Sequence, residues 1–162
     1  MEWAEVVANP ALRDLPFKIE LNEYGKIVMT PAKVIHAMYR GELGYLLHKQ
    51  RLDGLCATNC AIRTRQGTKV ADVAWVSLDR AALIRDECDA SIAPQVCLEV
   101  VYAKREMNAK KRLYFEQGAH EVWFCGEYGQ MAFYDKAGKI LNSKLFPDFP
   151  ICVELPLTGR HL

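Results

Sequence analysis

The chain has 162 residues, which fits one domain with a substantial core. Hydrophobic residues make up 51% and charged residues 25%, a composition that excludes a largely disordered protein. Lys and Arg total 21 against 20 Asp and Glu, so the net charge of +1 excludes a globally basic nucleic-acid binder.

The first part of the chain predicts three elements. We expect a short helix near Trp3–Ala8 and a strand at Lys26–Met29. A long helix should follow at about Pro31–Lys49, because Thr30 is a suitable N-cap and proline is favoured at the first helical position. One apolar stripe supports this helix: Ile35, Tyr39, Leu43 and Leu46.

A β-hairpin comes next, with strands at Ala57–Thr64 and Lys69–Ser77 joined by the turn-like residues 65–68. The run Gln95–Tyr102 is rich in β-branched residues and apolar on both faces, as a central strand would be. A helix is expected at about Arg105–Gln117, where Gly118 can end it.

Two further strands are expected, at His120–Cys125 and Gln130–Tyr134. The order is mixed α/β, and the helix before the first of these strands should connect two parallel neighbours. No repeat or linker divides the chain, so we predict one domain, with residues 1–24 as an extension that packs on residues 25–162.

Two features bear on location. No stretch is long and apolar enough to span a bilayer, and residues 1–10 have neither the charge nor the apolar core of a signal or transit peptide. The six cysteines lack a C-x-x-C pair, and Cys56 and Cys60 are the closest two. We therefore expect reduced thiols, a cytoplasmic location and no membrane partner.

Two carboxylates interrupt apolar strands. Asp72 stands in VADVAWV and Glu99 in VCLEVV. An ionised carboxylate buried alone is costly, so such groups pair, neutralise or bind a metal. Each could instead lie at a strand end facing water or an arginine, but two in consecutive buried strands favour a shared cation. Mg²⁺ (or Mn²⁺) is the natural candidate, since it needs only one or two protein carboxylates.

The helix after Glu99 offers a lysine that would stabilise negative charge on a phosphate. Helical spacing puts Lys110 beside Leu113 and Met107, on the side that faces the core. Lys110 could instead form a solvated i,i+4 pair with Glu106, and the neighbouring Lys111 remains an alternative.

Three segments, ADVAWVSLDR (71–80), APQVCLEVV (93–101) and EMNAKKRLYFEQGAHEVWF (106–124), resemble the Uma-two-type family of the PD-(D/E)XK nuclease superfamily. That family was long described only as a domain of unknown function. The resemblance continues weakly into residues 129–155 and back to His36. It implies a restriction-endonuclease-like mixed sheet with flanking helices and an αβββαβ core.

The resemblance also implies roles for single residues. Asp72 matches the motif aspartate and Glu99 the motif glutamate, and the backbone carbonyl of Val100 would be a further metal ligand. Val101 stands where a lysine is usual, and Lys110 matches the lysine that the family carries on the following helix. The candidate accessory residues are His36, which matches a histidine of the first helix, and Glu106.

Two functions are consistent with these residues. The first is a metal-dependent DNA endonuclease, in which the candidate nucleic-acid contacts are Lys104, Arg105, Lys111 and Arg112. A homodimer would suit it, because cutting both strands of a duplex needs two sites.

The second is a catalytically inactive module that keeps the fold to bind DNA or a protein. It is favoured by the near-neutral charge, by the short segment Tyr102–Arg105, and by Asn59, where relatives often carry an acidic residue. An enzyme of another class is not supported, because the chain has no nucleophile motif or glycine-rich phosphate loop.

Overall fold

The computed structural model describes residues 1–100 and 104–157. The elements follow in the order α1 (Trp3–Ala8), η1 (Pro10–Leu12), β1 (Phe17–Leu21), β2 (Ile27–Pro31), α2 (Val34–Gln50), β3 (Gly54–Thr64), β4 (Gly67–Ser77), α3 (Leu78–Ile84), β5 (Val96–Val100), α4 (Lys104–Glu116), β6 (Glu121–Cys125), β7 (Met131–Asp135) and β8 (Gly138–Ile140).

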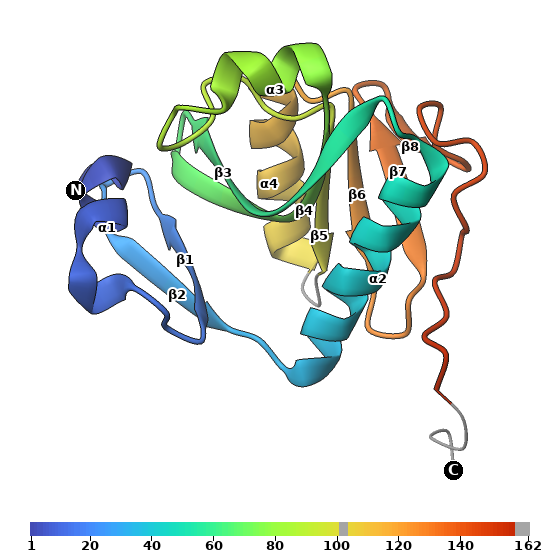
Figure 1. The fold of residues 1–162 in the computed structure, drawn as a ribbon, viewed down its shortest axis with the longest axis horizontal. Coiled ribbons are helices and arrows are strands. Elements are labelled where there is room, and N and C mark those ends of the chain that lie inside the picture. Colours follow the sequence, from blue (N-terminus) through green and yellow to red (C-terminus); the bar gives the residue numbers. More distant parts are fainter. Residues whose placement is uncertain (101–103, 158–162) are drawn as a thin grey trace.

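The main sheet has six strands in the order β3-β4-β5-β6-β7-β8 (Figure 1). Strands β5 and β6 run parallel and are joined through α4, whereas the other neighbouring pairs are antiparallel. The expected αβββαβ core is confirmed as α2-β3-β4-β5-α4-β6, with the short helix α3 inserted before β5.

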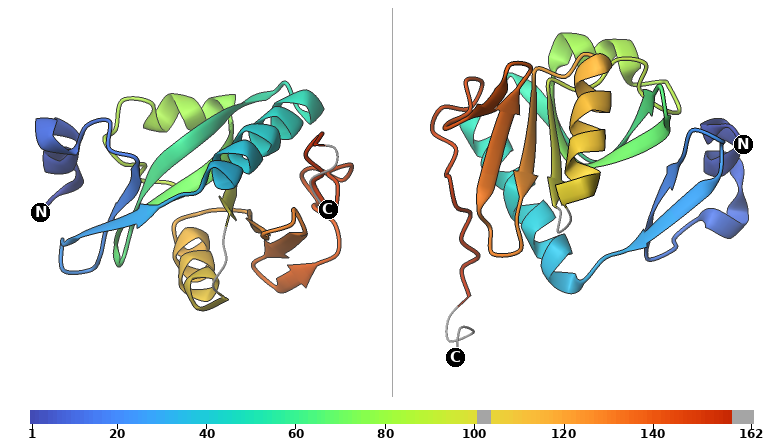
Figure 2. Two further views of the ribbon diagram at one scale, coloured as in Figure 1. Left: turned by 90° about the horizontal axis from the view of Figure 1, so that it is seen from below. Right: turned by 180° about the vertical axis from the view of Figure 1, so that it is seen from behind.

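Helices cover both faces of this sheet. Helix α2 crosses one face and α4 lies on the other, as the views from the front and from behind show (Figures 1 and 2). Tyr39 and Leu43 of α2 pack on a core that includes Leu98 and Trp123. Tyr114 of α4 belongs to a second core on the opposite face. Strand β5 is buried along its whole length between these layers, as expected for a central strand.

The regular pairing of the sheet is interrupted beside Asp72. Thr58 pairs with Val73 and Cys60 with Ala71, but no pairing joins Asn59 to Asp72, and Asn59 has a positive φ of 51°. The direction of the side chains also changes there. In a regular strand Ala71 and Val73 would point to the same face, but Ala71 packs in the α4-side core and Val73 in the α2-side core. The backbone irregularity therefore falls at the position of the predicted metal ligand.

The N-terminal segment forms α1, as expected, and then a separate two-stranded sheet of β1 and β2 (Figure 1). The strand expected at residues 26–29 is confirmed as β2, but the expected helix start at Pro31 is wrong. Thr30 and Pro31 continue β2, paired with Lys18 and Phe17. Helix α2 begins at Val34, where His36 Nδ1 accepts a hydrogen bond of 3.1 Å from the Lys33 backbone N–H.

Other boundaries differ by a few residues. The turn of the hairpin is tighter than expected, because β3 reaches Thr64 and β4 begins at Gly67. Helix α4 ends at Glu116, two residues before Gly118, whose φ of 107° suits a residue without a side chain. The predicted short segment Tyr102–Arg105 overlaps residues 101–103, which lie outside the described part of the chain.

Candidate metal and phosphodiester site

The sheet register brings the two strand carboxylates together. Val73 pairs with Leu98 in the antiparallel β4–β5 ladder, so the next opposed positions are Asp72 and Glu99. Both are almost fully buried, each with 1% of its surface exposed. The sequence signal of two charges in adjacent apolar strands therefore corresponds to one site.

Asp72 is held by backbone and by cations. Its Oδ2 accepts a hydrogen bond of 2.8 Å from the Val100 backbone N–H. Its Oδ1 lies 3.1 Å from Lys18 Nζ and 3.1 Å from an Arg40 guanidinium nitrogen. Both contacts are ion pairs, and within the described residues this buried oxygen has no hydrogen-bond partner.

Glu99 has three donors. Lys18 Nζ lies 2.7 Å from Oε2, while Oε1 accepts from Lys110 Nζ at 3.0 Å and from the Tyr114 hydroxyl at 2.7 Å. The ammonium of Lys18 therefore stands between the two carboxylates, in contact with both.

Lys110 faces the core, as helical spacing predicts. Besides Glu99 it contacts Glu20, whose Oε2 lies 2.7 Å from Nζ and also accepts from the Val70 backbone N–H at 2.7 Å. The alternative pairing with Glu106 is therefore wrong. The alternative lysine, Lys111, lies over the Tyr134 ring with Nζ 4.1 Å from the centroid, on another side of α4.

The surroundings shift the pKa values of Asp72 and Glu99 in opposite directions. Burial raises the pKa of Asp72 to about 6, and the neighbouring Glu99 carboxylate adds to the rise. Burial alone would also raise the pKa of Glu99, but the ammonium groups of Lys110 and Lys18 outweigh it and lower this pKa to about 2.

Two partners of Glu99, Lys110 and Tyr114, have raised pKa values. Burial would lower the pKa of Lys110, but the carboxylates of Glu99 and Glu20 outweigh it and raise this pKa. Burial raises the pKa of the Tyr114 hydroxyl. At neutral pH the site thus holds an ionised Glu99, a charged Lys110 and a neutral tyrosine that donates a hydrogen bond.

These groups open into a pocket of about 440 Å³. Its walls come from β1, β2, α2, β4, β5 and α4, and both predicted accessory residues, His36 and Glu106, line it. Burial lowers the pKa of His36, and the nearby charges of Arg40 and Lys33 act in the same direction. A concave pocket with perturbed acids and several cations suits an anionic ligand.

Comparison with known proteins identifies the family. A family model named Uma2, with the description "Putative restriction endonuclease", matches residues 9–137. The chain belongs to the Uma2 family. A crystal structure from Anabaena variabilis ATCC 29413, described as "a putative nuclease belonging to DUF820", has a similar fold. Its TM-score is 0.67 and its identity 14%, over 83% of this chain and 79% of that one. The curated proteins hold no match to the chain.

Restriction-endonuclease-like families generally use divalent metals, and the donor set of this Uma2 protein fits one. Asp72 and Glu99 are oxygen donors, and Asp72 Oδ1 is buried without a hydrogen bond from any described residue. In the described residues, no three side chains of His, Cys, Asp or Glu gather as a metal cluster. Two carboxylates with a backbone carbonyl and water still satisfy Mg²⁺, which usually keeps several waters.

The predicted nucleic-acid contacts all belong to α4 in this Uma2 protein. Arg105 is exposed, and so is Arg112, which lies 4.0 Å from Glu116. Lys111 is occupied with Tyr134. Lys104 begins α4, but its side chain lies outside the described part of the structure.

Four residues of the site were not predicted: Lys18, Glu20, Arg40 and Tyr114, the last of which donates to Glu99 from α4. Lys18 and Glu20 belong to β1, and Arg40 projects from α2. The alternation in FKIEL places Lys18 and Glu20 on the same face of a strand, and this period of two is the signal that could have found them.

A fourth buried strand acid, Glu121 at the start of β6, has neutral partners instead. Its two carboxylate oxygens accept from Trp123 Nε1 (2.8 Å), the Ser143 hydroxyl (2.7 Å) and the backbone N–H groups of Lys144 and Leu145 (3.0 Å each). This carboxylate ties the segment after β8 to the sheet. A buried strand acid therefore marks the candidate site only where cations gather around it.

Replacing Glu121 with alanine is expected to lower the free energy of unfolding by about 2–3 kcal/mol, because buried donors would lose their acceptor. Urea denaturation followed by circular dichroism measures the change. Glu154→Ala removes an exposed carboxylate and is the matched control. Equal losses in the two variants would contradict the structural role of Glu121.

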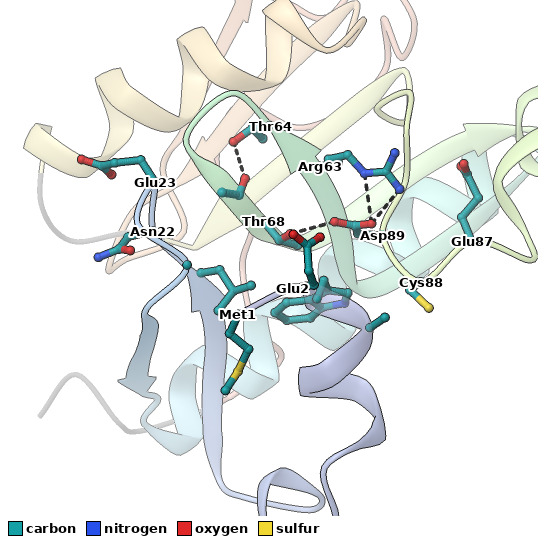
Figure 3. Close-up of a pocket in the computed structure, with 15 residues that line it drawn as sticks. Met1, Glu2, Asn22, Glu23, Arg63, Thr64, Thr68, Glu87, Cys88 and Asp89 are labelled. Atoms are coloured by element: carbon teal, nitrogen blue, oxygen red, sulfur yellow. Dashed lines mark hydrogen bonds and ion pairs between the residues drawn. The ribbon is translucent and has the colours of Figure 1, made fainter.

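A second pocket, of about 490 Å³, lies between the N-terminal segment and the end of the β3–β4 hairpin (Figure 3). Its most buried acid, Asp89, already accepts hydrogen bonds from the Arg63 guanidinium and the Thr68 hydroxyl (Figure 3). The opposed carboxylates and their lysines lie in the other pocket, so that one is the candidate site.

Proposed function

We propose that this chain is a metal-dependent DNA endonuclease that hydrolyses phosphodiester bonds. The observation that carries the proposal is the pair of opposed, buried carboxylates with the Lys110 ammonium 3.0 Å from Glu99. Membership of the Uma2 family, whose description is "Putative restriction endonuclease", supports it.

Each residue has a distinct task in this proposal. Asp72 and Glu99 would hold one divalent ion, Mg²⁺ or Mn²⁺, together with the Val100 carbonyl. When bound, the ion supplies Lewis-acid activation of the phosphodiester and of water. Lys110 would stabilise the negative charge that develops on the phosphate oxygens. Tyr114 and Glu20 keep the carboxylate and the ammonium in place through the contacts described above.

Basic groups at the pocket support a polyanionic substrate. Lys18, Arg40, Lys69 and Lys110 line it beside four acids, Glu20, Asp72, Glu99 and Glu106, so a bound divalent ion would make the pocket net positive although the whole chain has a net charge of only +1. Local gathering of cations is what a nearly neutral DNA-binding protein requires. A second copy of the chain would provide the second site for cutting both strands of a duplex.

The proposal includes a cytoplasmic location. All six cysteines are unpaired, which suits a reducing compartment. Among the residues that the structure describes, no helix is both long and apolar enough to cross a bilayer.

Calorimetric titration with Mn²⁺ tests the metal site. The variant Asp72→Asn with Glu99→Gln keeps the shape of both side chains but removes both charges, so its affinity should fall at least about tenfold below that of the wild type. Circular dichroism checks that the variant is folded. Unchanged binding in the folded double variant would refute this site.

The second candidate is an inactive module that binds DNA or a protein. The specific observation in its favour is that the Lys18 ammonium already bridges the two carboxylates. A folded wild type that takes up no Mn²⁺ and leaves plasmid DNA intact in Mg²⁺ would favour this function over the endonuclease.

A further inference from the structure

The ammonium of Lys18 stands where two carboxylates would share a cation. Its Nζ lies 2.7 Å from Glu99 Oε2 and 3.1 Å from Asp72 Oδ1, and only 8% of its side chain is exposed. A divalent ion held by both carboxylates would have oxygens at about 2.0–2.1 Å. The ion and the ammonium therefore cannot occupy this position together.

Charge balance leads to the same exclusion. Three carboxylates, Glu20, Asp72 and Glu99, contact three cations, Lys18, Arg40 and Lys110. The formal charge of this buried group is already zero. Adding a dication without losing a cation would leave an uncompensated charge of two, which is costly away from water.

Lys18 is the cation of the three that a shared ion would displace, because it alone of them contacts both Asp72 and Glu99. Lys110 also contacts Glu20 and comes from the long helix α4, and Arg40 is anchored on α2. Lys18 belongs to the two-stranded sheet of β1 and β2, which stands to one side of the main sheet (Figure 1). Its side chain lines the 440 Å³ pocket, so the pocket has room for the released ammonium.

From this geometry we infer that Lys18 is an internal competitor for the metal. It closes the site by bridging Asp72 and Glu99, and divalent metal binds by displacing it. The inference rests on the proposed metal site and adds a means by which the N-terminal β1 strand sets the affinity of that site. The closed state keeps two buried carboxylates compensated when no metal is bound.

Mn²⁺ titration of Lys18→Met is the direct test. Removing the competitor should tighten Mn²⁺ binding at least about tenfold, which corresponds to 1.4 kcal/mol. Lys69→Met is the matched control, because Lys69 lines the same pocket but donates to the Leu21 carbonyl at 3.1 Å. The Lys69→Met variant also loses one positive charge, but its affinity for Mn²⁺ should change only about twofold. A merely structural Lys18 would lower stability in the variant without tightening metal binding.

The outcomes separate the inference from the proposed function. If the wild type binds Mn²⁺ and Lys18→Met binds no more tightly, the competitor role is refuted and the metal site stands. If only Lys18→Met binds, the inference is supported, and the wild type is a closed form. If neither folded protein binds, both the inference and the metal-dependent function are wrong.

The wild-type chain provides a second measurement that needs no variant. An amine-acetylating ester should modify Lys18 slowly without metal, because its ammonium is buried and paired. Saturating Mn²⁺ should raise the acetylated fraction of Lys18, measured by mass spectrometry of its peptide, while that of Lys69 stays constant. Lys18 that remains equally protected in the metal complex would overturn the inference.

Discussion

Replacing Lys110 with methionine is expected to slow metal-dependent cleavage of DNA by about 10²–10³-fold, the usual effect of removing one group that stabilises charge in a transition state. Methionine keeps most of the length and the apolar stem of lysine, so the packing of α4 beside the buried Leu113 and Tyr114 should persist. The expected loss comes from the missing ammonium at the pocket.

The affinity for metal distinguishes this role from a structural one. Lys110 is a cation next to Glu99, so removing it should not weaken Mn²⁺ binding to the two carboxylates. Lys144→Met is the control for a lost positive charge, because Lys144 is largely exposed and pairs with Asp135 far from the pocket lining. A Lys110→Met protein that cuts at the wild-type rate would remove Lys110 from the mechanism.

Charges inside apolar strands were the strongest sequence signal of the candidate site. Asp72 and Glu99 break runs of Val, Ala, Cys and Leu, and strand pairing then makes them neighbours. The same signal does not distinguish function from structure. Glu121 is equally buried, but its partners are an indole, a hydroxyl and backbone N–H groups that no local pattern reveals.

Helical spacing favoured Lys110 over its neighbour Lys111 as the lysine of the site but did not decide between them. The two lysines differ by about 100° around the helix, and the sequence placed Lys110 towards the core without excluding Lys111. Tertiary structure decides between them, because Tyr134 of β7 takes one ammonium and the acids of β1 and β5 take the other.

The contribution of β1 could not be predicted from local sequence. Lys18 reaches Glu99 across 81 positions of the chain, and FKIEL has the composition of an ordinary amphipathic strand. The wrong start of α2 has a related cause. Thr30 and Pro31 form a good local helix start, but pairing with β1 extends β2 through both residues. Tertiary pairing outweighed the local capping preference.

The second large effect is expected in the core that supports β5. Trp123 of β6 is fully buried and pairs in register with Leu98, the residue before Glu99. Its ring contacts three phenylalanines, with centroid distances of 5.0 Å to Phe133, 5.6 Å to Phe146 and 4.7 Å to Phe149. One side chain thus joins two strands to the segment that follows β8.

Trp123→Ala is expected to lower the free energy of unfolding by about 3–5 kcal/mol, because it removes a large apolar side chain and leaves a cavity among rings that cannot collapse around it. The indole N–H to Glu121 is lost as well. Typical domains are stable by only about 5–15 kcal/mol, so the urea concentration at the unfolding midpoint should fall steeply. The slope of the free energy of unfolding against urea concentration should stay similar.

Two variants separate the causes of this loss. Trp3→Ala makes the same truncation at a half-buried position and should cost less, since a site near the surface can refill with water or neighbouring atoms. Trp123→Phe keeps an aromatic ring and removes the N–H donor, so it should fall between the wild type and Trp123→Ala. If Trp123→Ala cost no more than Trp3→Ala, the cluster around Trp123 would not be the support of β5 and its carboxylate.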